Sequence, residues 1–226
     1  MLFGKIIVIE GLDGSGKKTQ SRILADQLSE RGHNVKIISI PNYKSLSSGP
    51  LRIYLQGGLS ENAFDVNAYA ASSFFAVDRF INYIKFWKDF YQKKDSILIC
   101  DRYTTSNMIY QLAKIKRECW DEFLEWLIEY EYKKLEIPEP DAVVYLKIPL
   151  KISQELMKIR YKGDISRRDL HESDEKYLVE CELAAQYSSR KFNWNIIDCL
   201  DKNEKIDTTE RISNKILKIA KSIIEG

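Results

Sequence analysis

The sequence predicts an α/β fold in which helices flank a five-stranded parallel sheet, giving three layers. Three observations support this class. Apolar, β-branched runs alternate with helical patterns along the chain, an order that produces parallel strands joined by right-handed crossovers. A glycine-rich loop separates the first apolar run from the first helical pattern. No internal repeat or low-complexity tract interrupts this alternation, so we expect residues 1–226 to form a single domain.

The composition excludes several classes of function. The 35 basic and 33 acidic residues nearly cancel to a net charge of +2, so no overall field favours a nucleic-acid polymer or an anionic membrane as partner. No apolar stretch approaches the ~20 residues of a membrane span, and the N-terminus runs directly into a strand pattern, so we expect a cytoplasmic protein. The 4 cysteines are widely separated and only 2 histidines occur, which argues against a zinc site or a redox pair.

The strands and helices follow from local patterns taken in order. Apolar or β-branched runs predict strands over residues 5–9, 35–40, 97–101, 142–148 and 194–198. Apolar residues at helical spacing predict helices over residues 19–31, 65–94, 104–116, 119–135, 149–160, 173–191 and 206–224. The pattern loosens over residues 41–60, where we expect an insertion beside the site with a short helix ending at Gly57.

The loop over residues 11–19 has the spacing of a phosphate-binding P-loop. Gly11 is followed after four residues by Gly16 and Lys17, and the loop lies between a predicted strand and a predicted helix, as the motif requires. Glycines let successive backbone N–H groups face one anion, and the lysine reaches the β- and γ-phosphates. A glycine-rich turn that binds nothing is the alternative. We assign the phosphates of ATP to Gly11, Leu12, Asp13, Gly14, Ser15, Gly16, Lys17, Lys18 and Thr19.

One position departs from the motif. Lys18 follows Lys17 where a serine or threonine hydroxyl usually contacts Mg²⁺. A shifted register does not restore the motif, because the flanking glycines would then fall at Leu12 and Lys17. Thr19 is one helical step further on, about 100° around the axis, so it does not simply replace the missing ligand. The protein contacts of the metal therefore stay open.

The strand predicted over residues 97–101 ends in a carboxylate and is followed by an arginine. Beside a P-loop, Asp101 is suited to the magnesium shell, and Arg102 to clamping an anion. The alternative for both residues is a surface turn. On this basis Asp101 is the candidate metal ligand, and the cofactor is Mg²⁺.

The helix predicted over residues 65–94 is rich in aromatic side chains, most of which should belong to the core or an interface. Phe75 and Arg79 are the exception, because they lie four apart on one helix face and could stack on a base and bond its edge. The aromatic residues of the helix over 119–135 are expected to serve packing only.

The most charged stretch begins at Arg160 and contains Gly163, Arg167 and Arg168. A solvated surface loop is one explanation of such a run. The other is a lid over about residues 160–172 whose arginines close over the transferring phosphates. With the P-loop, these features complete the predicted class: a P-loop three-layer α/β fold with a short lid.

Taken in order, the motifs resemble the thymidylate kinase family. The resemblance covers nearly the whole chain and separates this family from adenylate, guanylate and cytidylate kinases. It rests on Glu10-Gly11-Leu12-Asp13-Gly14-Ser15-Gly16-Lys17, then Pro41, then Phe75-Ala76-Val77-Asp78-Arg79, then Asp101-Arg102-Tyr103 with Ser106-Asn107 and Tyr110.

The resemblance implies transfer of the γ-phosphoryl group of ATP to dTMP, giving dTDP and ADP, with Mg²⁺. It implies a monophosphate-binding insertion over about residues 41–110. By similarity Asp13 bonds the deoxyribose 3′-hydroxyl or lies near the acceptor phosphate, and Arg102 holds that phosphate. Phe75 stacks on thymine, Arg79 and Asn107 contact its polar edge, and Tyr110 crowds the 2′ position. The implied dTMP-binding residues are Asp13, Pro41, Phe75, Arg79, Arg102, Asn107 and Tyr110.

Members of the family carry their catalytic arginine either in the P-loop or in the lid. Gly14 stands where the first type has arginine, so the chain is similar to the lid type. Among the lid arginines, Arg160 should contact bound ATP, and Arg167 or Arg168 should act during transfer. The implied catalytic residues are Asp13, Lys17, Arg102, Arg167 and Arg168.

The resemblance also implies a homodimer, with the aromatic helix as a plausible interface. Two other functions remain open at this stage. A kinase for another nucleoside monophosphate would keep the P-loop and change the base pocket. A non-catalytic nucleotide-binding regulator would keep the P-loop alone, and Lys18 is the one feature in its favour.

Overall fold

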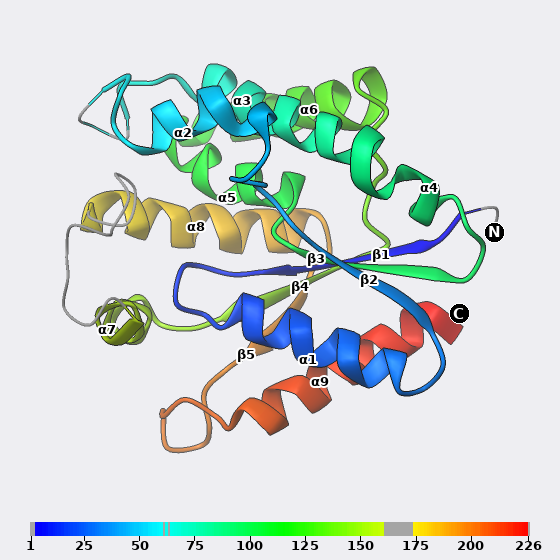
Figure 1. Cartoon of the computed structure of the whole chain (residues 1–226). Helices are drawn as coiled ribbons and strands as arrows, with labels where there is room; N and C mark the ends of the chain where they lie inside the picture. The colour runs from blue at the N-terminus through cyan, green and yellow to red at the C-terminus, as the bar shows by residue number, and fades with distance from the viewer. Residues whose placement is uncertain (1–2, 61, 63, 161–173, 226) are drawn as a thin grey trace.

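The computed structural model describes residues 3–60, 62, 64–160 and 174–225. Its centre is a parallel sheet with helices on both faces (Figure 1). The strands are β1 (Lys5–Glu10), β2 (Asn34–Ser39), β3 (Ser96–Asp101), β4 (Ala142–Lys147) and β5 (Asn195–Asp198). The five predicted strands and the α/β class are therefore confirmed. No strand begins or ends more than one residue away from its predicted boundary.

The strand order is β2-β3-β1-β4-β5, with β1 in the middle. Parallel pairing sets Ile9 of β1 beside Asp101 of β3 and Glu10 beside Tyr145 of β4. The loops that follow β1 and β3 therefore emerge next to each other. In a sheet of this kind the carboxyl ends of the strands form the ligand-binding edge, so the P-loop and Arg102 are brought together there.

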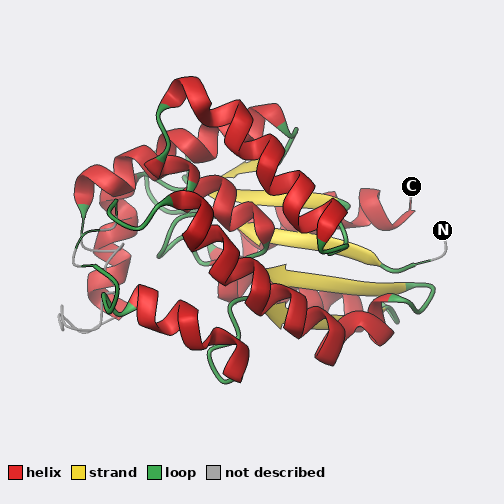
Figure 2. Cartoon of the chain, turned by 90° about the horizontal axis from the view of Figure 1, so that it is seen from above, coloured by secondary structure: helices red, strands yellow, loops and turns green. Residues whose placement is uncertain are grey.

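Alternate residues of β1 build two separate cores. Ile6 and Val8 pack with apolar side chains of the helices that include Leu124 and Ala184, whereas Ile7 and Ile9 pack on the other face with Leu24 and its neighbours. Helices α1 (Lys17–Ser29) and α9 (Thr209–Glu225) cover this second face (Figures 1 and 2). Helices α5 (Asn107–Tyr110), α6 (Trp120–Ile128) and α8 (Glu175–Lys191) cover the first. Because both faces of β1, β3 and β4 are buried, these strands are nearly continuous apolar runs rather than alternating ones.

Within the described residues, each predicted helical segment contains an α-helix, but several of the segments are shorter than predicted or interrupted. The α-helices are α1 (Lys17–Ser29), α2 (Gly49–Leu55), α3 (Ala68–Asn82), α4 (Lys88–Tyr91), α5 (Asn107–Tyr110), α6 (Trp120–Ile128), α7 (Leu150–Arg160), α8 (Glu175–Lys191) and α9 (Thr209–Glu225). Short 3-10 turns lie at Leu46–Ser48, Thr104–Ser106, Leu112–Lys114 and Arg117–Cys119, and π-helical segments at Tyr83–Trp87 and Glu129–Lys134.

The helix predicted over residues 104–116 is wrong as one continuous element. Only α5 is α-helical there, with 3-10 turns on both sides. The side chains of Thr104, Thr105 and Ser106 donate hydrogen bonds to buried glutamates from distant parts of the chain. Such side-chain bonds compete with regular helix formation, and they fix this segment against the sheet.

The predicted lid falls largely outside the described residues. The backbone of Arg160 ends α7, but its side chain, and residues 161–173 with Arg167 and Arg168, lie beyond what the structure describes.

Candidate active site

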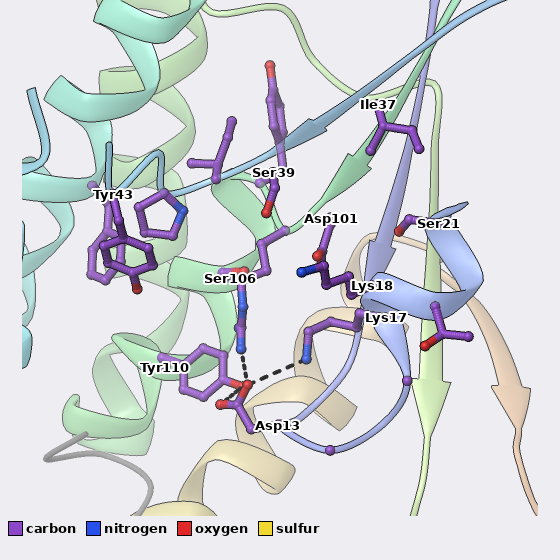
Figure 3. A pocket seen from close by; sticks show the side chains of 18 of the residues that line it. Asp13, Lys17, Lys18, Ser21, Ile37, Ser39, Tyr43, Asp101, Ser106 and Tyr110 are labelled. Atoms are coloured by element: carbon purple, nitrogen blue, oxygen red, sulfur yellow. Dashed lines mark hydrogen bonds and ion pairs between the residues drawn. The ribbon is translucent and has the colours of Figure 1, made fainter. Parts of the chain in front are cut away.

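A cavity of about 1120 Å³ opens at the carboxyl ends of β1 and β3 (Figure 3). Most of the predicted site residues line it. They are Asp13, Gly14, Gly16, Lys17, Lys18, Thr19, Pro41, Phe75, Arg79, Asp101, Arg102, Asn107 and Tyr110. Gly11, Leu12 and Ser15 belong to the loop but do not line the cavity. The structure thus brings together residues that are up to about 100 positions apart, as the order of motifs in the sequence predicts.

The P-loop wraps around the side chain of Lys17. Its Nζ donates to the carbonyl oxygens of Gly11 (2.8 Å) and Leu12 (2.9 Å), and the residue is only 7% exposed. Burial and the nearby charge of Arg102 together lower the pKa of Lys17 to about 8, although the surrounding carboxylates act in the opposite direction. A lysine held in this way is available to phosphate oxygens without reorganisation of the loop.

Two loop glycines are required by close approach as well as by backbone angle. Gly11 has φ +151° and Gly14 has φ +84°. A Cβ at Gly14 would lie 2.7 Å from the carbonyl oxygen of Ser153 and 3.1 Å from Cγ of Met157, both in α7. The Ser153 hydroxyl also donates to the carbonyl oxygen of Asp13. Helix α7 therefore packs directly on the P-loop, and a side chain at position 14 would displace it.

Asp13 joins the P-loop to the loop after β3. It forms an ion pair with Arg102, accepts a hydrogen bond from the Tyr110 hydroxyl at 3.1 Å, and lies 3.7 Å from Nζ of Lys17 (Figure 3). Burial alone would raise the pKa of Asp13, but the charges of Arg102 and Lys17 and the hydrogen bond from Tyr110 outweigh it and hold the pKa well below its usual range. Asp13 is therefore ionised at neutral pH.

Arg102 is held in an unusual backbone conformation. Its φ is +70°, in the left-handed region that non-glycine residues rarely adopt. Glu10, fully buried at the end of β1, accepts hydrogen bonds from the Tyr103 backbone N–H (3.3 Å) and the hydroxyls of Thr105 (2.8 Å) and Ser106 (2.7 Å). These bonds hold the loop that directs Arg102 toward Asp13.

The residues predicted to contact a base lie together at the other end of the cavity. Phe75, Arg79 and Asn107 line it with Pro41. Arg79 is 1% exposed and forms a buried ion pair with Glu131, with Nε 2.5 Å from Oε2 and Nη2 3.2 Å from Oε1. Glu131 lies in the segment whose aromatic residues we expect to serve packing only. The same segment also contributes this buried carboxylate, which binds two of the predicted base contacts, Arg79 and Asn107.

Two further residues at the site carry no recognisable pattern in the sequence. Gln111 lines the cavity and is 1% exposed, and its Oε1 has no hydrogen-bond partner among the described residues. Ser21 lines the cavity near Lys17, and its hydroxyl is likewise unpartnered within that part of the chain. Buried polar atoms normally have partners, so both side chains are suited to contacting a ligand or its bound water.

The carboxylate of Asp101 is 9% exposed and lines the cavity next to the P-loop. No three His, Cys, Asp or Glu side chains gather as a metal cluster within the described ranges. Magnesium at nucleotide sites takes one or two carboxylates and completes its shell with water and phosphate oxygens. Asp101 fits this pattern, and the Ser21 hydroxyl, which has no partner among the described residues, lines the same cavity and could bind a coordinated water. The described residues do not fit an ion that is held by protein groups alone.

A sequence model of the thymidylate kinase family matches residues 9–210, which is most of the chain. The chain belongs to the thymidylate kinase family. A probable thymidylate kinase of Pyrococcus horikoshii is 31% identical over 166 residues, covering 74% of this chain and 75% of that protein. A thymidylate kinase of Mycobacterium tuberculosis is 30% identical over 188 residues, covering 80% and 86%.

The same fold occurs in a solved thymidylate kinase structure from Candida albicans, with a TM-score of 0.70 and 22% identity over 97% of this chain and 92% of that one. At this identity the likeness supports the fold alone. Membership of the family assigns the chain to the nucleotide-binding kinases and makes phosphorylation of dTMP its activity. No described helix is long and apolar enough to cross a membrane.

Proposed function

We propose that this chain transfers the γ-phosphoryl group of ATP to dTMP through the residues of the cavity described above. The observation that carries the proposal is the cluster of Asp13, Arg102 and Tyr110 between Lys17 and the base-contacting residues. A donor phosphate on the P-loop and an acceptor phosphate on Arg102 would meet beside Asp13. Phosphoryl transfer depends mainly on positioning and charge stabilisation, and this arrangement supplies both.

The acceptor end has the side chains that dTMP requires. Residues 41–110 would supply the monophosphate-binding insertion, with Phe75 stacked on the thymine ring. Arg79 and Asn107 would contact its polar edge, and the unpartnered Gln111 Oε1 adds a further acceptor beside them. The ring of Tyr110 lies under the guanidinium of Arg102, 5.1 Å from Cζ. A fixed ring there would leave little room for a 2′-hydroxyl and disfavour ribonucleotides.

Mg²⁺ would bind between Asp101 and the phosphates of ATP. When bound, the ion neutralises charge that develops on the transferring phosphoryl group. Replacing Asp101 with asparagine should raise the Mg²⁺ concentration needed for half-maximal activity, and the binding of Mg²⁺-ATP by calorimetry should weaken in parallel. An unchanged magnesium dependence in both measurements would remove Asp101 from the metal site.

The catalytic arginine would lie outside the P-loop, in the segment that begins at Arg160. The close approach of Ser153 and Met157 to Gly14 supports this, since an arginine at position 14 would collide with α7. Arg167→Ala or Arg168→Ala should lower kcat by about 10²–10⁴ with a smaller effect on dTMP affinity, and Arg160→Ala should mainly weaken ATP binding. If neither of the first two variants lowers kcat tenfold, the catalytic arginine lies elsewhere.

A homodimer is the assembly that the surface of α3 supports. Along α3 and the following π-helical segment, Tyr83 and Trp87 are buried, whereas Val77, Phe80, Ile84 and Phe86 form an exposed apolar surface. Large contiguous apolar patches on a protein surface are typical of interaction sites. Light scattering should give twice the monomer mass, and Phe80→Glu should give the monomer. A monomeric wild-type protein would contradict the proposal.

The experiment that tests the proposed function is a coupled ADP-release assay against a panel of monophosphates. With ATP and Mg²⁺, dTMP should be the preferred acceptor, and UMP should turn over far more slowly. Another nucleotide kinase would prefer a different member of the panel. A regulator would bind ATP but release no ADP in response to any acceptor. None of the observations above favours either alternative.

A further inference from the structure

Glu131 is fully buried, lies on the π-helical segment Glu129–Lys134, and does not line the cavity. Its carboxylate accepts four hydrogen bonds. Oε2 accepts from Nε of Arg79 (2.5 Å) and the hydroxyl of Thr104 (2.8 Å). Oε1 accepts from Nη2 of Arg79 and Nδ2 of Asn107, both at 3.2 Å. One buried side chain thus fixes both of the residues expected to contact the base.

The chemistry of this carboxylate determines how Asn107 is oriented. All four groups that face this carboxylate donate to it, so both of its oxygens act as acceptors. The amide group of Asn107 must therefore turn its NH₂ toward Glu131. Its Oδ1, which accepts no hydrogen bond from the described residues, is left as the atom available to the cavity that Asn107 lines.

The same carboxylate orients Arg79. Glu131 occupies Nε and Nη2, and the guanidinium lies over the Tyr103 ring with Cζ 5.5 Å from its centroid. The two N–H groups of Nη1 and the second N–H of Nη2 then remain as donors for a ligand. The base end of the cavity therefore combines a fixed donor on Arg79 with a fixed acceptor on Asn107. Without Glu131, the amide of Asn107 could turn over and reverse one half of this pattern.

We infer that Glu131 is a positioning residue that sets base selectivity: it fixes a donor-acceptor pair complementary to a 4-oxo pyrimidine with a protonated N3, and opposed to a 4-amino pyrimidine. This inference rests on the proposed function of the site. Thymine and uracil offer a carbonyl oxygen to Arg79 and an N–H to Asn107. Cytosine offers an amino group and a bare ring nitrogen, so both contacts are mismatched. A site built to hydrogen-bond one pattern rejects the other because its own buried polar groups are left unpaired.

Two substitutions of Glu131 separate this role from simple packing. Glu131→Gln keeps the shape but introduces an NH₂, which favours the opposite orientation of Asn107. Glu131→Asp is shorter but remains an acceptor only. The readout is kcat/KM for dTMP, dUMP and dCMP with each variant, together with thermal unfolding to establish folding. Thr104→Val serves as a matched control, because it removes one donor to Glu131 without altering Arg79 or Asn107.

We expect Glu131→Gln to reduce the ratio of dTMP to dCMP turnover by about 10- to 100-fold, the usual effect of mismatching a buried hydrogen bond. The ratio of dTMP to dUMP should stay within about threefold, because these bases share the same edge. Glu131→Asp and Thr104→Val should retain the preference for dTMP over dCMP even where overall activity falls.

If Glu131 only served packing, the two variants would change places. The ratios of kcat/KM for dTMP to dCMP and for dTMP to dUMP would then lie closer to wild type in the isosteric glutamine variant than in the aspartate variant. That result would overturn the inference. If the glutamine variant does not fold, the wild-type protein still decides, because comparable turnover of dUMP and dCMP would also overturn it. Failure of the proposed function is a different result: wild-type protein that releases no ADP in response to dTMP.

Discussion

The two ends of the cavity are built in different ways. At the end proposed to bind ATP, the P-loop is shaped by its backbone: glycines with positive φ surround Lys17, whose Nζ donates to two carbonyl oxygens of the loop itself. At the end proposed to bind dTMP, buried side chains hold other side chains in place by hydrogen bonds. Glu10 fixes the loop after β3, and Glu131 fixes Arg79 and Asn107.

This difference determines what each end demands of the sequence. A backbone cradle needs glycines at fixed spacing within one short stretch, so it leaves a local motif. A network of buried side chains needs partners that meet only after folding, and their separation in sequence carries no fixed pattern. Each end should therefore respond to mutation in its own way, and the predictions below run from the largest expected effect to the smallest.

Lys17→Ala should have the largest effect, because it removes the point charge at the β- and γ-phosphates. We expect kcat to fall by about 10³-fold or more in single-turnover measurements. Stability should not fall with it. Burial lowers the pKa of Lys17, which means that holding the charged form in the folded state costs free energy at neutral pH.

Lys18→Ala is the matched control for this variant, since Lys18 is the adjacent lysine and is exposed. Its loss should cost much less activity. Equal losses of activity in the two variants would contradict the specific role of Lys17 in binding the phosphates. A lowered melting temperature for Lys17→Ala would also count against it.

Arg102→Ala should weaken dTMP binding by about 2–5 kcal/mol, the usual cost of leaving a desolvated charge partner unpaired. ATP binding should change little, because Lys17 and the loop backbone remain in place. Separate titrations with each nucleotide measure the two effects. If ATP affinity fell strongly while dTMP affinity stayed unchanged, Arg102 would belong to the ATP site. The proposed division of the cavity into an ATP end and a dTMP end would then be wrong.

The difference between the ends also explains what the sequence could predict. The parallel sheet, the P-loop and the carboxylate-arginine pair at Asp101 and Arg102 follow from local patterns, and the structure brings them together. Phe75 and Arg79 were predicted to share a helix face, and both line the cavity. These features depend on periodicity and strand order, which the sequence records directly.

Gln111, Glu131 and the role of Glu10 as an anchor for the loop after β3 could not be predicted in the same way. Glu131 lies between Tyr130 and Tyr132 in a charged stretch that resembles a solvated helix surface. Its burial follows from the packing of α6 and the next segment against α3, a contact between regions distant in sequence. The broken helix over residues 104–116 was missed for the same reason, since its threonines and serine bind glutamates from elsewhere.

Glu10→Gln should destabilise the protein without removing any group that touches a nucleotide. The glutamine NH₂ would face N–H and O–H donors that now bond the carboxylate, and leaving such groups unsatisfied costs about 1–3 kcal/mol. For a chain of this size that corresponds to a fall of about 2–10 °C in Tm, measured by calorimetry.

The matched control is Glu139→Gln. Glu139 pairs with Lys133 at 2.9 Å, but both side chains are more than half exposed, so the pair should contribute little. A Tm that falls equally in both variants would contradict the role of Glu10 as a buried anchor.

The smallest expected effect is a proton taken up when ATP binds. In the free protein the pKa of Lys17 is lowered to about 8 by burial and by the charge of Arg102, against an ordinary value of 10.5. Because the pKa is lower in the folded state, the free-energy cost of burying the charge is fully present below pH ~8. This cost decreases as the pH rises from there toward the pKa of the lysine in the unfolded chain. Phosphate oxygens favour the charged form, so ATP should raise this pKa again.

At about pH 8.5, roughly three quarters of a proton should then enter on binding, and less than about a fifth near pH 7.3. Calorimetry in buffers of different ionisation enthalpy measures this uptake as a buffer-dependent heat. Lys114→Met provides the control, because burial also lowers the pKa of Lys114 to about 8, yet Lys114 does not line the cavity. Uptake should persist in that variant and disappear in Lys17→Arg, whose guanidinium stays charged throughout. If the binding heat at about pH 8.5 were the same in every buffer, no proton would be taken up, and the pKa of Lys17 in the free protein would not be lowered as expected. The P-loop would then be less preorganised around Lys17 than its geometry indicates.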